Sequence, residues 1–228
     1  MVEEIKQEAL KIRSHGISVF SAKVDKTPAI RRQNRIVELR SKLQTTAEME
    51  IDFSHPQVAG IAVNCGTIPG QNKDLECLDI DCPILSKTFM DELCAANKDL
   101  GEKLKGCVEQ TPSEGLHIFY YLTQGKSKCR DVAAMSSERS RAWLAESKSK
   151  GSTKIVAPPL IETKGAGGYV VGFCSKAISK IDGTIKSYQM IHGSVETIPH
   201  LTDSEHEFLL AFAGSYDERS VKKFTTKN

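Results

Sequence analysis

The segment 75–83, Leu-Glu-Cys-Leu-Asp-Ile-Asp-Cys-Pro, constrains the fold of this chain more than any other part of the sequence. It predicts a β-strand that the proline ends. Because side chains alternate along a strand, Asp79 and Asp81 lie on one face, and the apolar residues beside them lie on the other. The apolar neighbours and the terminal proline are typical of a strand that ends at a cleft.

The two carboxylates of this strand favour a metal site. Carboxylates side by side repel each other and raise each other's pKa unless a cation lies between them. Hard oxygen ligands of this kind suit Mg²⁺ or Mn²⁺. A solvated edge strand is the alternative interpretation, and this motif alone leaves both open.

The order of the predicted elements indicates a mixed α+β fold, in which a mostly antiparallel part follows residue 110 or so. The stretch 23–50 is polar and basic, and we expect it to be partly helical. The remaining predicted elements are a helix at 3–14, strands at 17–22, 59–66 and 75–82, a helix capped by Ser86 that runs to about residue 104, strands at 116–122, 154–164, 167–173 and 187–193, a helical insertion at 137–150, and a last helix from a capping box at Thr202 to about residue 213.

Composition excludes several classes of protein. Hydrophobic residues make up 39% of the 228, and none of the apolar runs approaches the ~20 residues that span a bilayer. The first residues form an acidic and basic helix pattern, which is unlike a secretory signal peptide. Seven cysteines without a Cys-x-x-Cys pair disfavour a disulfide framework or a zinc knuckle. We therefore expect a cytoplasmic protein with no membrane partner.

Charge is divided unevenly along the chain although the net charge is only +2. Residues 71–116 hold five lysines against ten acids, whereas residues 123–154 hold eight basic residues against three acids. Such a division suits a protein that holds cations in one region and attracts polyanions to another, but two solvated faces of an ordinary protein are the commoner explanation of such a pattern. The sequence Gln-Gly-Lys-Ser at 124–127 lacks the earlier glycine of a P-loop, which excludes a nucleotide-hydrolysing motor of that type.

Two further motifs place polar residues at turns. In Thr-Pro-Ser-Glu-Gly-Leu-His, residues 111–117, both Ser113 and His117 can donate a hydrogen bond to a bound phosphate. A structural histidine in a strand is the alternative. Farther along, Glu162 and Lys164 share a strand face before a glycine-rich turn at 165–168. This pair fits either a third metal ligand with a phosphate-neutralising lysine or a surface ion pair.

In this order the motifs resemble those of the primase-polymerase (prim-pol) domain of the archaeo-eukaryotic primase superfamily. That family carries an acid-x-acid strand, a serine and a histidine at a turn and strand, and an acidic residue ahead of a Gly-Gly-Tyr hairpin. The matching residues here are Asp79 with Asp81, Ser113 with His117, and Glu162 ahead of Gly167, Gly168 and Tyr169.

A looser similarity extends the resemblance over about residues 5–213. It includes a Lys-x-Pro sequence at Lys26 and Pro28 that follows the first predicted helix and strand. The chain departs from the family pattern at Glu114, where glycine is common, and at Glu162, where aspartate is more usual. Neither departure removes a carboxylate or the histidine.

The resemblance implies an α+β, archaeo-eukaryotic primase-like fold, in which an N-terminal α/β lobe packs against an RRM-like, mostly antiparallel lobe with the catalytic cleft between them. A single catalytic domain at 1–213 is then expected, divided into lobes at about 1–110 and 111–200 and a C-terminal helix at 201–213, with a tail or linker at 214–228.

The resemblance also implies an activity: a DNA primase/polymerase that adds nucleotides to a 3′-hydroxyl and releases pyrophosphate. Two divalent cations, Mg²⁺ or Mn²⁺, would be bound by Asp79, Asp81 and Glu162, and we expect these three acids to meet. The expected partners are nucleoside triphosphates, a single-stranded or primed DNA template, and a replicative helicase domain or protein. The residues expected to bind the nucleotide are Ser113, His117, Lys164, Gly66 and Gly168.

The basic regions are expected to contact the phosphates of the template. Two alternatives to the polymerase remain, a catalytically inactive nucleic-acid-binding replication domain and a metal-dependent nuclease. The three acids argue against the first alternative, because a pure binding protein gains nothing from clustered like charges. The residues expected to bind nucleic acid are Arg31, Arg32, Arg35, Lys126, Lys128 and Arg130.

Overall fold

Strand β4 (Lys73–Ile80) carries Asp79, ends one residue before Asp81, and lies inside the larger of two main antiparallel sheets. The computed structural model describes residues 2–30, 34–149 and 159–220. Strands of the large sheet follow the order β12-β5-β6-β4-β8-β7, and β3 also pairs with β4. These strands are β3 (Gly66–Thr67), β5 (Cys107–Gln110), β6 (Leu116–Thr123), β7 (Arg130–Ala133), β8 (Ile161–Lys164) and β12 (Gln189–Gly193).

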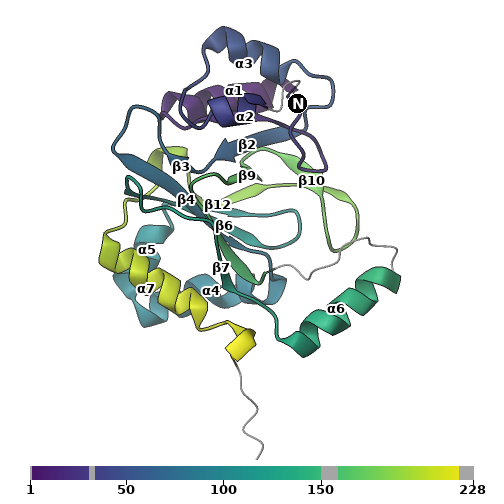
Figure 1. Ribbon diagram of the computed structural model, residues 1–228, viewed down its shortest axis with the longest axis vertical. Helices are drawn as coiled ribbons and strands as arrows, with labels where there is room; N and C mark the ends of the chain where they lie inside the picture. Colours follow the sequence, from purple (N-terminus) through teal and green to yellow (C-terminus); the bar gives the residue numbers. More distant parts are fainter. Residues whose placement is uncertain (1, 31–33, 150–158, 221–228) are drawn as a thin grey trace, which may run out of the picture.

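A three-stranded sheet lies over one face of the large sheet, and two helices cover its outer side (Figure 1). One continuous core joins these layers, and it includes Ile12, Met49, Val63 and Phe119. The elements on this side are β1 (Val19–Ala22), β2 (Gly60–Asn64) and β9 (Tyr169–Gly172) in the sheet, the covering helices α1 (Val2–Ser14) and α3 (Thr46–Phe53), and the short helix α2 (Asn34–Glu38).

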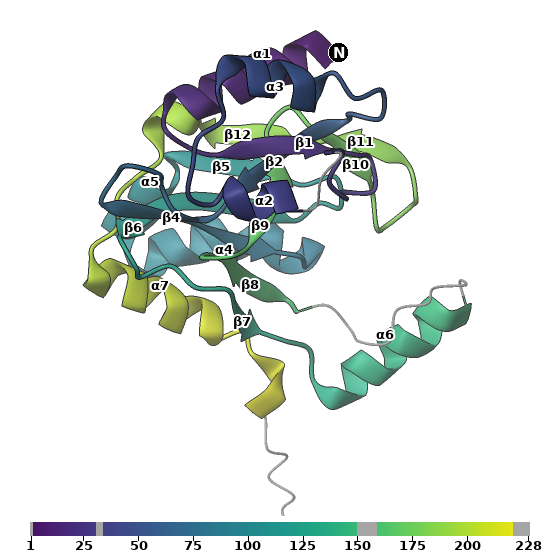
Figure 2. The same ribbon diagram turned by 45° about the horizontal axis from the view of Figure 1, so that its top comes forward.

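Three helices cover the opposite face of the large sheet, and a second core lies beneath them (Figure 1). Helix α6 (Ser137–Ser149) instead extends away from the body of the molecule (Figure 2). In the described part of the chain, no helix combines the length and the apolar character of a membrane span. The covering helices are α4 (Pro83–Ala96), α5 (Lys98–Leu104) and α7 (Asp203–Gly214), and two short 3-10 helices are η1 (Val195–Thr197) and η2 (Glu218–Ser220).

Side chains alternate along β4, so its two faces contact different parts of the molecule. Leu78 and Ile80 point into the core beneath the helices, whereas Leu75 and Cys77 pack toward the small sheet. Asp79 continues the second face and is 9% exposed, because it borders a cleft at the end of the strand. The hairpin of β10 (Lys176–Ile178) and β11 (Ile185–Ser187) flanks the same cleft.

The structure confirms the α+β fold class and most of the predicted elements, including the capping box of Thr202. The predicted Ser86 cap is wrong, because helix α4 already begins at Pro83, and the Ser86 hydroxyl donates to the Cys82 carbonyl inside the first turn. The helix also does not continue to residue 104, since the Asn97 side chain caps a separate helix α5.

Several elements differ from the prediction in extent. The expected strand at 154–164 is present as β8 over its last residues, and its first residues lie outside the described ranges. Strand β5 and the hairpin of β10 and β11 were not predicted. Strands from both sides of residue 110 interleave in the large sheet, because β4 pairs with β6 and β8.

Candidate active site

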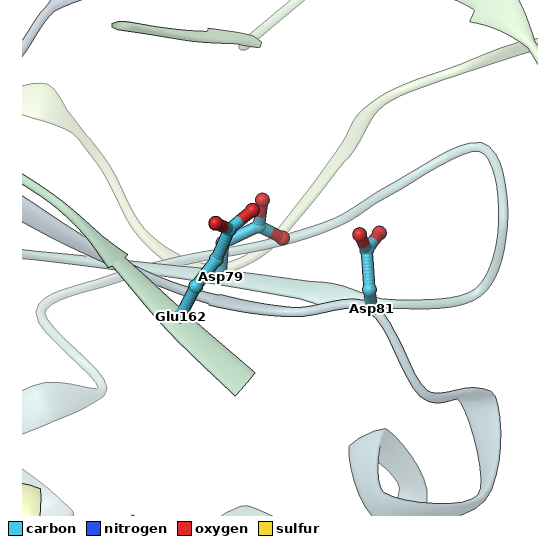
Figure 3. Close-up of side chains that lie close together, drawn as sticks. All are labelled: Asp79, Asp81 and Glu162. Carbon is cyan, nitrogen blue, oxygen red and sulfur yellow. The ribbon is translucent and has the colours of Figure 1, made fainter. Parts of the chain in front are cut away.

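Three carboxylates from two neighbouring strands meet at the cleft. Asp79 of β4 lies directly opposite Glu162 of β8 in the strand register, and Asp81 follows just past the end of β4 (Figure 3). Ligand oxygens of all three lie within 4.8 Å of one another. The structure therefore brings together the acids that were expected to meet, along a cleft of about 460 Å³.

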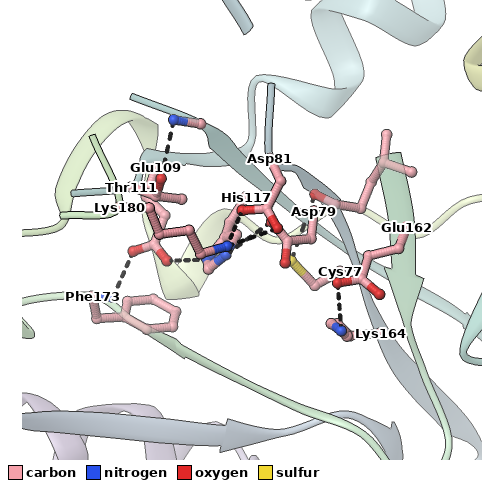
Figure 4. Close-up of polar contacts among 12 residues, drawn as sticks. Cys77, Asp79, Asp81, Glu109, Thr111, His117, Glu162, Lys164, Phe173 and Lys180 are labelled. Carbon is pink, nitrogen blue, oxygen red and sulfur yellow. Dashed lines mark hydrogen bonds and ion pairs between the residues drawn. The ribbon is translucent and has the colours of Figure 1, made fainter. Parts of the chain in front are cut away.

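Two lysines balance part of this negative charge. The Lys164 ammonium lies 2.5 Å from a Glu162 oxygen, and the Lys180 ammonium lies 2.8 and 2.9 Å from the two oxygens of Asp81 (Figure 4). Burial raises the pKa of Glu162, and Lys164 opposes that shift. Burial also acts to raise the pKa of Asp79, but the nearby positive charges, with that of His117 first, lower it below its usual range.

The donor set fits a hard divalent cation. All three groups offer carboxylate oxygens, which Mg²⁺ and Mn²⁺ prefer. The buried Asp79 Oδ1 has no hydrogen-bond partner among the described residues, although His117 Nε2 lies 3.4 Å away as an ion-pair partner, so it keeps acceptor capacity toward the cluster. Buried acceptors are normally satisfied, and a cation shared with Asp81 and Glu162 would satisfy this one.

A row of polar side chains crosses four strands of the large sheet through Asp79. His117 of β6 lies opposite Asp79, and Glu109 of β5 lies opposite His117. The His117 Nδ1 is 2.8 Å from Glu109 Oε1, and its Nε2 is 3.4 Å from Asp79 Oδ1. With Glu162 on the far side of Asp79, the row reads Glu109, His117, Asp79 and Glu162.

The carboxylates on both sides hold a positive charge on the buried imidazole. Burial alone would lower the pKa of His117, but the charge of Asp79, and then the hydrogen bond and charge of Glu109, raise it to about 9. Burial raises the pKa of Glu109, and the interaction with His117 opposes that change. Sequence patterns did not indicate Glu109, because they did not reveal the pairing of the four-residue strand β5 with β6.

Further basic residues line the cleft. Lys26 has a positive φ of 68°, and its ammonium lies 5.5 Å from the centre of the Tyr188 ring. Burial first, and then the charge of Lys180, lower the pKa of Lys26. Arg40 donates from Nη2 to the carbonyl of Gly167 at 2.7 Å and so holds the glycine turn. Sequence patterns did not indicate Lys180 or Arg40.

The residues expected to bind nucleotide occupy different positions. His117, Lys164 and Gly168 line the cleft. Ser113 is buried, and its hydroxyl accepts a hydrogen bond from the Lys180 main-chain N–H at 2.8 Å, which ties the Thr-Pro-Ser turn to the hairpin of β10 and β11. Gly66 has a φ of 107° and faces Ala166, where an added Cβ would lie 2.8 Å from the Ala166 Cα.

The residues expected to bind nucleic acid are spread more widely. Arg31 and Arg32 lie outside the described residues, and Arg35 belongs to α2. Lys126 forms an ion pair with Asp203 at 3.2 Å and follows the strand residues that pair with the start of β4. The start of β4 at Lys73 lies eight residues before Asp81, so at about 3.3 Å per residue Lys126 lies roughly 25 Å along the sheet from Asp81.

Two of these basic residues lie closer to the glycine turn. The Lys128 main-chain N–H donates to a buried carboxylate, that of Glu76, while its side chain is exposed. Arg130 begins β7 opposite Thr163 of β8. Their roles in nucleic-acid binding stay a prediction.

An acid cluster beside a histidine and lysines, at the end of an antiparallel strand, defines a class of site suited to metal-assisted transfer of phosphate groups. Residues 9–203 match the family model of the bifunctional DNA primase/polymerase, N-terminal domain. This match covers most of the chain, so the protein belongs to that family, whose general function is that of a DNA primase/polymerase. A comparison with curated proteins finds no match.

Proposed function

We propose that the protein is a template-directed nucleotidyltransferase, a DNA primase/polymerase that adds nucleotides to a 3′-hydroxyl and releases pyrophosphate. The observation that carries this proposal is the meeting of Asp79, Asp81 and Glu162 within 4.8 Å, in a chain of the primase/polymerase family. In the reaction, the 3′-oxygen forms a bond to the α-phosphorus while the bond from that phosphorus to the pyrophosphate oxygen breaks.

The three acids are proposed to hold two divalent cations, Mg²⁺ or Mn²⁺. Cations bound there would activate the 3′-hydroxyl and stabilise the charge of the triphosphate and of the leaving pyrophosphate. The pairing of β4 with β8 sets Asp79 opposite Glu162, which supports a role for the two carboxylates as a pair of ligands. Asp81 lies just beyond the end of β4, and without a bound cation its carboxylate is neutralised by Lys180.

The lysines of the cleft are proposed to exchange partners when substrate binds. Lys164 and Lys180 pair with the carboxylate oxygens that would hold a divalent cation, so their ammonium groups would be released from these oxygens when such a cation is bound. Each ammonium that is released can then pair with a phosphate oxygen of the nucleotide. His117 directs Nε2 toward the same space, where it can donate to the triphosphate and offset its developing charge.

Residues of the turns are proposed to make the remaining contacts with the nucleotide. Gly168 lines the cleft, and Gly66 supports the neighbouring turn by its close approach to Ala166. Ser113 would act through its hydroxyl, close to the Lys180 main chain. The template, the nucleoside triphosphates and a replicative helicase are the proposed partners, and seven free thiols support a cytoplasmic setting.

A primer-extension assay tests the proposal. A labelled primer annealed to a longer template is incubated with the protein, four deoxynucleotides, and Mg²⁺ or Mn²⁺, and an unprimed template with deoxynucleotides or ribonucleotides runs in parallel. Longer products support the polymerase, and products without a primer support initiation. Shortened primer would indicate a nuclease, and bound but unchanged DNA would indicate an inactive binding domain.

A further inference from the structure

Glu109 is a buried carboxylate at the edge of the proposed active site. Its side chain is completely buried, and its two oxygens have different partners. Oε1 lies 2.8 Å from His117 Nδ1, and Oε2 accepts the main-chain N–H of Phe173 at 2.5 Å (Figure 4). Burying a charge is costly unless it is paired and hydrogen-bonded, and this carboxylate is both.

The same carboxylate joins the two sheets. Glu109 belongs to β5 of the large sheet, whereas Phe173 directly follows β9 of the small sheet. Phe173 has a φ of 58°, and a side chain on the preceding Gly172 would collide with Glu109 Oε1. The backbone at this corner therefore makes room for the glutamate and holds one of its oxygens in a fixed place.

His117 has little freedom to turn. Its ring lies between Tyr188, at 5.6 Å between centres, and the edge of Phe119, at 6.0 Å. With Nδ1 directed at Glu109, Nε2 faces Asp79 at the cleft. The partner of one ring nitrogen thus decides which ring nitrogen faces a ligand in the cleft.

We propose that Glu109 is a positioning residue for nucleotidyl transfer, which fixes the His117 ring so that Nε2 meets the triphosphate. This inference rests on the proposed function. Glu109 itself has no contact with the reacting atoms and acts through His117. It also ties the placement of this ring to the small sheet, through the Phe173 main chain.

A matched control lies on the other face of the central strand. Glu76 is also completely buried, and its Oε1 lies 2.7 Å from His206 Nε2. That pair lies on the helix-covered side of β4, away from the cleft, and Tyr120 donates to the same oxygen. A change from Glu76 to glutamine therefore removes an equally buried carboxylate from a histidine without touching the cleft.

The first experiment measures extension kinetics of Glu109→Gln and Glu76→Gln with dATP, Mg²⁺ and a primed template. Glutamine has one acceptor for two donors, so its amide group must face either Phe173 or His117. We expect the KM for dATP to rise about tenfold in Glu109→Gln with little change in kcat, by analogy with the loss of a partner of a ligating histidine. An unchanged KM, or an equal rise in folded Glu76→Gln, overturns the proposal.

A second variant covers the case in which Glu109→Gln does not fold. Glu109→Asp keeps the charge but is one methylene shorter, and it should raise the KM in the same direction. The effect of either variant should vanish in a His117→Ala background, because Glu109 acts through that ring. Effects that simply add in the double variant overturn the proposal.

A spectroscopic measurement separates this proposal from the proposed function. Nitrogen NMR of the imidazole, without substrate, reports the protonation and the hydrogen bonding of each ring nitrogen of His117. We expect protonated Nδ1 in the natural protein and a changed Nδ1 signal in Glu109→Gln, with the His117 signals unaltered in Glu76→Gln. If extension fails but these signals change as expected, the polymerase proposal is wrong and the positioning of His117 by Glu109 stands. An unaltered Nδ1 signal in Glu109→Gln overturns the positioning role.

Discussion

Strand β4 carries acids on both faces, and the two faces satisfy them in different ways. On the helix-covered face, Asp74 and Glu76 are completely buried and accept hydrogen bonds from main-chain N–H groups of the 125–128 loop. On the cleft face, one Asp79 oxygen accepts no hydrogen bond within the described residues and has an ion pair with His117 at 3.4 Å, and Asp81 is held by the side chain of Lys180.

This difference separates structural acids from a binding site. Main-chain donors are fixed by the fold, so they satisfy a carboxylate permanently. A lysine side chain is flexible and exchanges easily for another cation. The cleft face therefore has the charge and the exchangeable lysine partners that the proposed metal and triphosphate site needs, although both faces belong to one strand of eight residues.

The sharpest test of the comparison is to remove an acid from the cleft face. Asp81→Ala or Asp79→Ala should lower nucleotide incorporation by at least about 10³-fold, the scale of losing a group that stabilises the transition state. Circular dichroism should remain that of the natural protein. Extension near the natural rate, with either Mg²⁺ or Mn²⁺, would refute the assignment of these acids.

The pH dependence of stability tests the buried histidine between the two carboxylates. The pKa of His117 is about 9 in the folded protein, above its usual value of about 6.5. The charged His117 therefore contributes at most about 3 kcal/mol to the free energy of unfolding. This contribution is fully present below pH 6.5 and is lost as pH rises through 9. Urea unfolding at several pH values should show this loss, and His117→Ala should abolish that part of the slope.

Lys164 tests whether a cleft lysine serves the substrate or only its neighbour Glu162. Lys164→Ala should weaken the use of nucleotide about 10²-fold, by analogy with the loss of one transition-state donor. The measurement is kcat/KM for single-nucleotide insertion. If this value does not change, Lys164 is only the ion-pair partner of Glu162.

Asp74 gives the converse test on the helix-covered face. Its Oδ2 accepts from the N–H groups of Gly125 and Ser127 and from the Ser127 hydroxyl. Asp74→Ala leaves these donors without a partner and should lower the free energy of unfolding by about 2 kcal/mol. Extension per folded molecule should stay the same, and a selective loss of activity would break the distinction between the two faces.

The sequence predicted that Asp79 and Asp81 lie on one face and apolar residues on the other, because alternation along a strand is a local property, but it did not predict the buried acids Asp74 and Glu76 on the second face. It predicted β4, the helix capped by Thr202 and the positions of the acids for the same reason. The prediction that Glu162 lies beside Asp79 came only from the resemblance to a family, because the pairing of β4 with β8 joins segments far apart in the chain.

Glu109 and Lys180 were missed for a related physical reason. Glu109 lies in a strand of four residues, and Lys180 lies between two strands of three. The first of these strands, Cys-Val-Glu-Gln, has two apolar residues followed by two polar ones and so shows no alternation, and three residues are too few to show a period of two. Their side chains reach the site only through tertiary pairing, with His117 in one case and with Asp81 in the other.

The smallest expected effect concerns Lys126, at the far end of the sheet from the acids. Its ion pair with Asp203 is exposed, so Lys126→Ala should change the free energy of unfolding by less than about 0.5 kcal/mol. If its ammonium contacts a template phosphate as predicted, the variant should bind DNA more weakly. The slope of log K against log salt should also fall by about 1. An unchanged slope would remove Lys126 from the template path and leave the basic residues nearer the glycine turn, such as Lys128, as its candidates.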